Sequence, residues 1–156
     1  MQPRMSNPVT VVPEVLQPML AVGRAVSAFA ATHGVPARTI HLVHLRASQI
    51  NGCGFCVDMH SREALKDGDS QQRVMAVAAW HDAPWFTEPE RAALALAEGA
   101  TRLADRSEAV PDEVWADAAR HYEEPALAAL VLAIAAVNFW NRVNVPTRQL
   151  AGGWPG

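Results

Sequence analysis

Apolar residues recur at intervals of three and four through most of this chain, which is the spacing of one face of an α-helix. The first stripe runs from Val15 to Phe29 and stops at His33-Gly34, where a glycine favours a helix end. A second helix opens at Pro36 and reaches about Ser48, with an apolar stripe wide enough to predict that it is largely buried. No segment shows the strict alternation of apolar and polar residues that is typical of a half-exposed strand.

The same spacing, read with capping signals, predicts five further helices. They are expected at Cys53–Leu65, from caps at Asp69 and Ser70 to Trp80, from the Thr87 cap onward, from Pro111 to about His121, and from Glu123 to about Trp140. The last of these is apolar all round and rich in alanine, which favours a central position. The predicted class is all-α with about seven helices, in which residues 1–12 form a flexible lead, residues 13–156 form one domain, and the tail after Trp140 is irregular.

Composition narrows the function without naming it. A chain of 156 residues suits one domain, and its formal net charge of −3, without any Lys/Arg run, gives no footprint for nucleic acid or an anionic membrane. The longest apolar run, Ala126–Val137, is too short to span a bilayer. The first ten residues lack the apolar core of a secretory signal. We therefore expect a cytoplasmic protein that binds neither nucleic acid nor membrane.

The stretch SQINGCGFCVDMH carries the candidate chemistry because it holds both cysteines of the chain as C-x-x-C. On the predicted helix Cys53, Cys56 and His60 share one face, and the turn dipeptide Asn51-Gly52 precedes it. A helix N-terminus and a protonated imidazole both lower the pKa of a thiol, and the thiolate is the reactive form. The dipole favours Cys53 as the attacking sulfur, whereas the spacing to His60 favours Cys56, so both assignments stay open on the residues alone.

The motif SQINGCGFCVDMHSREA resembles the signature of the alkylhydroperoxidase AhpD-like family within the carboxymuconolactone decarboxylase superfamily, and AAWHDAPWFTEPERAALALAEGATRL and NFWNRVNVPTR are similar to it too. The resemblance implies an all-helical homo-oligomer, a trimer or hexamer, that reduces peroxides without a prosthetic group and is recycled by a dithiol reductant protein. It also implies that Cys56 attacks the peroxide, that Cys53 resolves the product and that His60 relays protons.

One position departs from the family pattern. The family carries a glutamate in an E-L-V-x-L-R run, whereas this chain has HLVHLR with His41 in that place, so His41 is the candidate base. Asp58 and Glu63 are expected to point away from the cysteine face. Two alternatives remain: a zinc site made by both cysteines, His60 and either His41 or His44, and a non-redox protein, decarboxylase-like or catalytically decayed, on the same scaffold.

Overall fold

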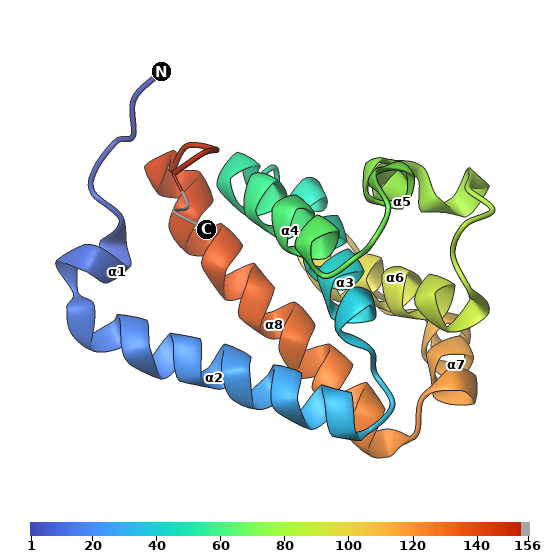
Figure 1. Cartoon of the computed structure of the whole chain (residues 1–156). Coiled ribbons are helices and arrows are strands. Elements are labelled where there is room, and N and C mark those ends of the chain that lie inside the picture. The colour runs from blue at the N-terminus through green and yellow to red at the C-terminus, as the bar shows by residue number, and fades with distance from the viewer. Residues whose placement is uncertain (154–156) are drawn as a thin grey trace.

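The computed structural model describes residues 1–153, and within that range it contains helices and no strand, which confirms the all-α class (Figure 1). The elements are α1 (Pro8–Val11), α2 (Pro13–Thr32), α3 (Ala37–Ile50), α4 (Gly54–Lys66), α5 (Gln71–Ala76), the 3₁₀ segment η1 (Val77–Asp82), α6 (Glu88–Thr101), α7 (Asp112–His121) and α8 (Glu124–Thr147). The expected domain and tail extend to residue 156, and residues 154–156 lie outside the described part of the chain.

Helix α8 is the central element, with α2 along one side and α3 and α4 along another (Figure 1). Small residues let these backbones approach closely, since Ala126, Ala129 and Ala133 of α8 are almost fully buried. One apolar cluster joins α2, α3, α6, α7 and α8, and a second lies on the other side of α3, around Leu42 and Leu45. Helix α3 therefore packs on both sides, which explains the width of its apolar stripe.

The end of α8 corrects the expectation of an irregular tail. The helix continues past Trp140 to Thr147 and includes Pro146 in its last turn. It ends at Arg148, which takes a left-handed conformation with φ 54°, and the Gln149 N–H donates to the Asn144 carbonyl at 3.0 Å, in the manner of a helix C-cap. This extra length carries the polar side chains of α8 to the cysteines.

Two expectations for shorter segments also change. The helix predicted from Ser70 to Trp80 is α-helical only over α5 and continues from Val77 as the 3₁₀ segment η1. Within η1 the chain is kinked at Ala79, whose φ of −127° and ψ of 39° are not helical. Ser70 is the N-cap of α5, and its hydroxyl accepts a hydrogen bond from the Arg73 N–H at 3.2 Å. Residues 1–12, expected to form a flexible lead, include the short helix α1, and the Arg4 N–H donates to the carbonyl of Thr147 at 2.9 Å.

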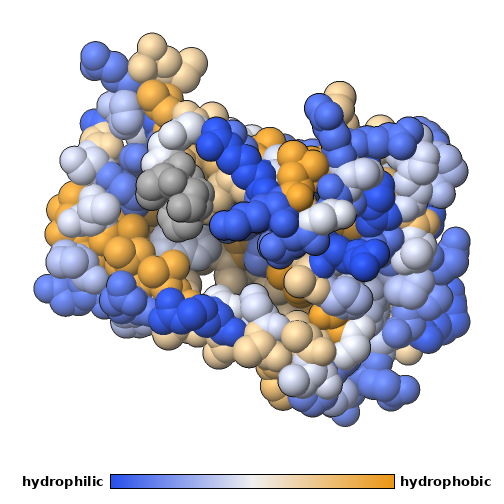
Figure 2. Space-filling view, viewed as in Figure 1, coloured by the Kyte–Doolittle hydropathy of each residue, from blue (hydrophilic) through white to orange (hydrophobic). Residues whose placement is uncertain are grey.

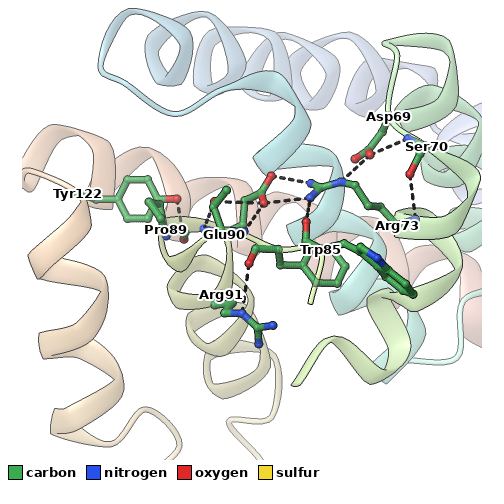
Figure 3. Close-up of polar contacts among 10 residues, drawn as sticks. Asp69, Ser70, Arg73, Trp85, Pro89, Glu90, Arg91 and Tyr122 are labelled. Carbon is green, nitrogen blue, oxygen red and sulfur yellow. Dashed lines mark hydrogen bonds and ion pairs between the residues drawn. The ribbon is translucent and has the colours of Figure 1, made fainter. Parts of the chain in front are cut away.

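The start of α6 forms the capping box that the sequence predicts, and the same carboxylate joins a buried ion pair (Figure 3). Glu90 accepts from the Thr87 backbone N–H at 2.9 Å and from the Arg73 guanidinium at 2.6 and 3.2 Å. Arg73 also donates to Asp69 at 2.8 Å, and Tyr122 donates to the Pro89 carbonyl at 2.8 Å. These contacts attach α5 and α7 to the beginning of α6.

Helix α2 exposes much of its apolar stripe. Val15, Val22 and Phe29, which lie seven residues apart and so on one face, are 36%, 44% and 45% exposed. Val11 and Val12 are also exposed, and Figure 2 shows a hydrophobic patch at the edge of the molecule beside α1. The buried residues of α2 are Val26 and Ala30 (8% and 0% exposed), which lie beside this exposed row in the C-terminal half of the helix.

Two helices of the described chain, α2 and α8, are long and apolar enough to cross a membrane when length and composition alone are counted. The expectation of no membrane span rested on the uninterrupted apolar run Ala126–Val137, which is too short to cross a bilayer, whereas the complete helix α8 is long enough. Half of the relevant window of α8 is buried inside the protein, as for the core helix of a helical bundle, whereas 11% of the α2 window is buried.

Candidate functional site

The cysteine pair lies where a tight turn enters α4. Gly52 has φ +67°, a conformation that suits glycine, and Cys53 follows as the N-cap of the helix. Its sulfur accepts from the backbone N–H of Cys56 at 3.3 Å. The two cysteines form a disulfide with a Cα–Cα distance of 5.3 Å, and both are buried, at 2% and 0% exposure. The C-x-x-C motif is thus a bridged pair at a helix N-terminus.

A cavity of about 570 Å³ opens beside this turn, between the start of α4 and the end of α8. Cys53 lines it together with Gly52 and Gly54, and Asn144 and Arg148 line it from α8 and its C-cap. Cys56 is absent from its lining residues, so of the two cysteines Cys53 is the one that borders the cavity.

Three asparagines of α8, spaced three residues apart, face the cysteine turn and were not among the residues that the sequence singled out. They are Asn138, Asn141 and Asn144, at 8%, 1% and 3% exposure. The Asn144 amide donates to the Cys56 sulfur at 3.4 Å. The spacing in NFWNRVN was a usable signal, but it was lost because the helix was expected to end near Trp140.

The other two asparagines hold the turn itself. Asn51 donates to the side-chain oxygens of Asn138 and Asn141, at 2.9 and 2.8 Å. Asn141 in turn donates to the Ser48 hydroxyl at 3.1 Å, and the Ser48 carbonyl accepts from the Cys53 N–H at 3.0 Å. Ser48 therefore has a structural role in this turn, and α8 fixes the path of the backbone into α4.

His60 has a carboxylate partner that was not expected. Its Nδ1 donates to Glu63 at 3.0 Å, and this hydrogen bond is the main cause that lowers the pKa of Glu63 below its usual 4.5. The expectation that Glu63 points away is wrong, because residues three apart on a helix are neighbours. His60 is 6% exposed, so the Glu63 carboxylate, which lies on α4 itself, is the partner of a buried imidazole.

The histidines of α3 meet this pair across the interface between the two helices. The rings of His44 and His60 have centroids 4.9 Å apart. Burial, followed by the charges of His60 and His41, lowers the pKa of His44 well below 6.5. His41 donates from Nε2 to Asp67 at 2.7 Å, at the end of α4. Polar side chains of α3 and α4 therefore contact one another across this interface.

Not all predicted site residues meet directly. Within the described part of the chain, neither His60 nor His41 makes a hydrogen bond to a cysteine sulfur. Among residues 1–153, no three or more His, Cys, Asp or Glu side chains are grouped so that they could hold a metal ion. The four side chains of the zinc alternative thus do not form one ligand set in this state.

Comparisons with known proteins agree with this architecture. The model of the carboxymuconolactone decarboxylase family matches residues 13–99. The uncharacterized protein YdfG of Bacillus subtilis (strain 168) is 40% identical over 107 residues, 69% of this chain and 71% of that protein. The uncharacterized protein YnjA of Escherichia coli (strain K12) is 34% identical over 103 residues, 66% of this chain and 55% of that protein.

Solved structures extend the likeness to the whole fold. ATU0492 from Agrobacterium tumefaciens, described as a protein of unknown function with a suggested role in antioxidant defence as an AhpD, matches with a TM-score of 0.88 and 33% identity over 98% of this chain and 100% of that one. The debrominase Bmp8 shares the fold, with a TM-score of 0.78 and 24% identity over 93% of this chain and 75% of that one. The chain therefore belongs to the carboxymuconolactone decarboxylase family and is one of its AhpD-like members.

Proposed function

We propose that this protein is a thiol-dependent peroxidase that reduces hydroperoxides through Cys53 and Cys56. The observation that carries the proposal is the disulfide at the N-terminus of α4, one turn before the His60–Glu63 pair. A bridge between cysteines three residues apart encloses too short a loop to stabilise the fold greatly, so a redox role suits it better than a structural one. The likeness to ATU0492 supports the same class of chemistry.

The oxidative half of the proposed cycle begins with the reduced pair. The Cys56 thiolate attacks the terminal oxygen of the hydroperoxide, the O–O bond breaks, and the alkoxide takes a proton to leave as an alcohol. Cys56 becomes a sulfenic acid. The Cys53 thiolate then attacks the Cys56 sulfur, a disulfide forms, and hydroxide leaves as water after it takes a proton. His60, steadied by Glu63, is the proposed proton relay.

The reductive half requires an external dithiol. Its first thiolate bonds to one sulfur of the bridge, and its second then displaces the protein thiol, so that the donor leaves as a disulfide and both cysteines return as thiols. Cys53 is the proposed point of attack, because it lines the cavity and Cys56 does not. His41 and Asp67 are proposed to link the histidine cluster to solvent, since the side chain of Asp67 is 51% exposed.

We also propose the cytoplasm as the location, since reduced dithiol donors are maintained there. A homo-oligomer is proposed through the exposed stripe of α2, because exposed apolar side chains that recur on one face of a helix are typical of an interface.

The direct test is steady-state reduction of a small organic hydroperoxide with dithiothreitol as donor, comparing the wild type with Cys56→Ser and Cys53→Ser. We expect Cys56→Ser to abolish turnover. We expect Cys53→Ser to react once and then stall as a sulfenic acid, which a sulfenic-acid probe would detect. Equal turnover by wild type and Cys56→Ser would refute the role of Cys56. Stoichiometric zinc in protein purified without chelator would favour the metal-site alternative instead.

A further inference from the structure

An unbroken chain of hydrogen bonds runs from the N-terminal segment to the buried sulfur of Cys56. The backbone N–H of Val9 donates to the side-chain oxygen of Asn7 at 3.2 Å. The Asn7 amide nitrogen donates to the Asn144 side-chain oxygen at 3.0 Å. The Asn144 amide nitrogen then donates to the Cys56 sulfur at 3.4 Å.

The first link of this chain determines the direction of the others. A backbone N–H can only donate, so the oxygen of Asn7 must face Val9 and its NH₂ group must face Asn144. The oxygen of Asn144 is thereby taken, and its NH₂ group is directed at Cys56. The sulfur is consequently held as a hydrogen-bond acceptor. Of the states open to a cysteine, the thiolate is the strongest acceptor and has no proton to donate.

Burial strengthens this contact. Cys56 is fully buried and Asn144 is 3% exposed, so water does not compete for the sulfur. A hydrogen bond to a charged acceptor gains strength in such surroundings, and a buried thiolate without a donor would be strongly disfavoured. Within residues 1–153, Asn144 is also the only side chain that donates a hydrogen bond to Cys56 Sγ.

We propose that Asn144 is a catalytic residue that stabilises the Cys56 thiolate, and that Asn7 is a positioning residue that orients the Asn144 amide. The consequence for turnover rests on the proposed function, whereas the effect on the thiolate does not. In the oxidative half, the hydrogen bond keeps Cys56 in its nucleophilic form. In the reductive half, a donor thiolate bonds to Cys53, the S–S bond breaks, and its electron pair goes to Cys56, where the Asn144 amide already points.

The N-terminal segment is docked in a way that suits this role. The Arg4 guanidinium donates to the Pro146 carbonyl at 3.0 Å, and the Gln149 amide donates to the Met5 carbonyl at 3.1 Å. These bonds join the residues before Asn7 to the end of α8. The segment before α1 therefore belongs to the site, although it is distant from the cysteines in sequence.

The test measures the pKa of Cys56 in a Cys53→Ser background, by the ultraviolet absorbance of the thiolate over a pH titration. Serine is a good N-cap, so this background retains the start of α4. Asn144→Leu keeps the side-chain shape but removes the donor. We expect it to raise the pKa of Cys56 by about one pH unit, which is a roughly tenfold loss of thiolate below the pKa. An unchanged pKa in a folded Asn144→Leu protein would overturn the proposal.

A second variant keeps the proposal testable if Asn144→Leu does not fold. Asn7→Asp preserves the oxygen that caps α1 but has no N–H to orient Asn144, so the pKa of Cys56 should also rise. Ser6→Asp is the matched control, since it adds the same charge one residue away and should change the pKa by no more than a few tenths. Equal shifts in both variants would refute the positioning role of Asn7. A protein that shows these shifts but never reduces a peroxide would refute the proposed function alone.

Discussion

We predict that His44 lowers the free energy of unfolding in mild acid, and that replacing it with phenylalanine makes this free energy less dependent on pH. Its Nε2 is buried between α3 and α4 without a hydrogen-bond partner. Burial is the largest cause that lowers its pKa well below 6.5, followed by the charges of His60 and His41. A hydrogen bond with the backbone of Ala133 acts in the opposite direction and is the smallest of these effects. The folded protein therefore keeps His44 neutral at a pH where the unfolded chain protonates it.

The sign follows from which state binds the proton first. As the pH falls below about 6.5, the unfolded chain takes up a proton and the folded protein does not, so the free energy of unfolding decreases. The stability is fully present above the unfolded pKa and is lost as the pH falls toward the folded one. For one such group the slope approaches about 1.4 kcal/mol per pH unit, and the loss between about pH 6.5 and 5.5 is about 1 kcal/mol.

Urea denaturation of wild type and His44→Phe at a series of pH values measures this directly. For each protein, the free energy of unfolding is plotted against pH. Subtracting one plot from the other cancels the contributions of His60, Glu63 and His41, which face the same interface. Between about pH 6.5 and 5.5, we expect the free energy of unfolding of His44→Phe to decrease by about 1 kcal/mol less than that of the wild type. His33→Gln, at the exposed end of α2, is the control and should keep the wild-type slope. Identical slopes for wild type and His44→Phe would refute the reasoning.

Three further predictions concern the relay, the fold and the assembly. Glu63→Gln removes the charge beside His60, and because such a hydrogen bond contributes about 1.5 kcal/mol, peroxide turnover should fall roughly tenfold in a stopped-flow assay. Arg73→Met leaves buried Glu90 without its partner and should lower the free energy of unfolding by about 3 kcal/mol, or the melting temperature by roughly 6–12 °C. Val22→Asp places a charge in the exposed stripe of α2 and should reduce the mass measured by sedimentation velocity to that of a monomer.

Matched controls separate these effects from general damage. Arg62→Met breaks an exposed pair with Asp58 and should cost less than about 0.5 kcal/mol, so a loss equal to that of Arg73→Met would contradict the argument from burial. Ser27→Asp adds a charge to another face of α2 and should leave the oligomer intact. A wild-type protein that sediments as a monomer would remove the proposal of assembly. Unchanged turnover in Glu63→Gln would exclude its carboxylate from the relay.

The helices and the place of the cysteine pair at the start of α4 could be predicted from sequence because their signals are local. The capping box at Thr87, the glycine turn before Cys53 and the apolar spacing of α3 each depend on residues within a few positions of one another. Glu63 was missed although its signal was equally local, since a carboxylate three residues beyond His60 lies within reach on a helix.

The remainder of the site depends on contacts between segments far apart in the chain, which periodicity cannot identify. Pro146 and the polar residues around it predicted an irregular tail, yet packing against α3 and α4 keeps α8 helical through Thr147. That extension brings Asn144 to Cys56 and docks the segment around Asn7 beside both. The sequence by itself therefore determined that two cysteines share a helix N-terminus with a histidine one turn away. Only the tertiary structure decided which sulfur receives a side-chain hydrogen-bond donor, because that donor comes from a helix whose position is set by packing rather than by local propensity.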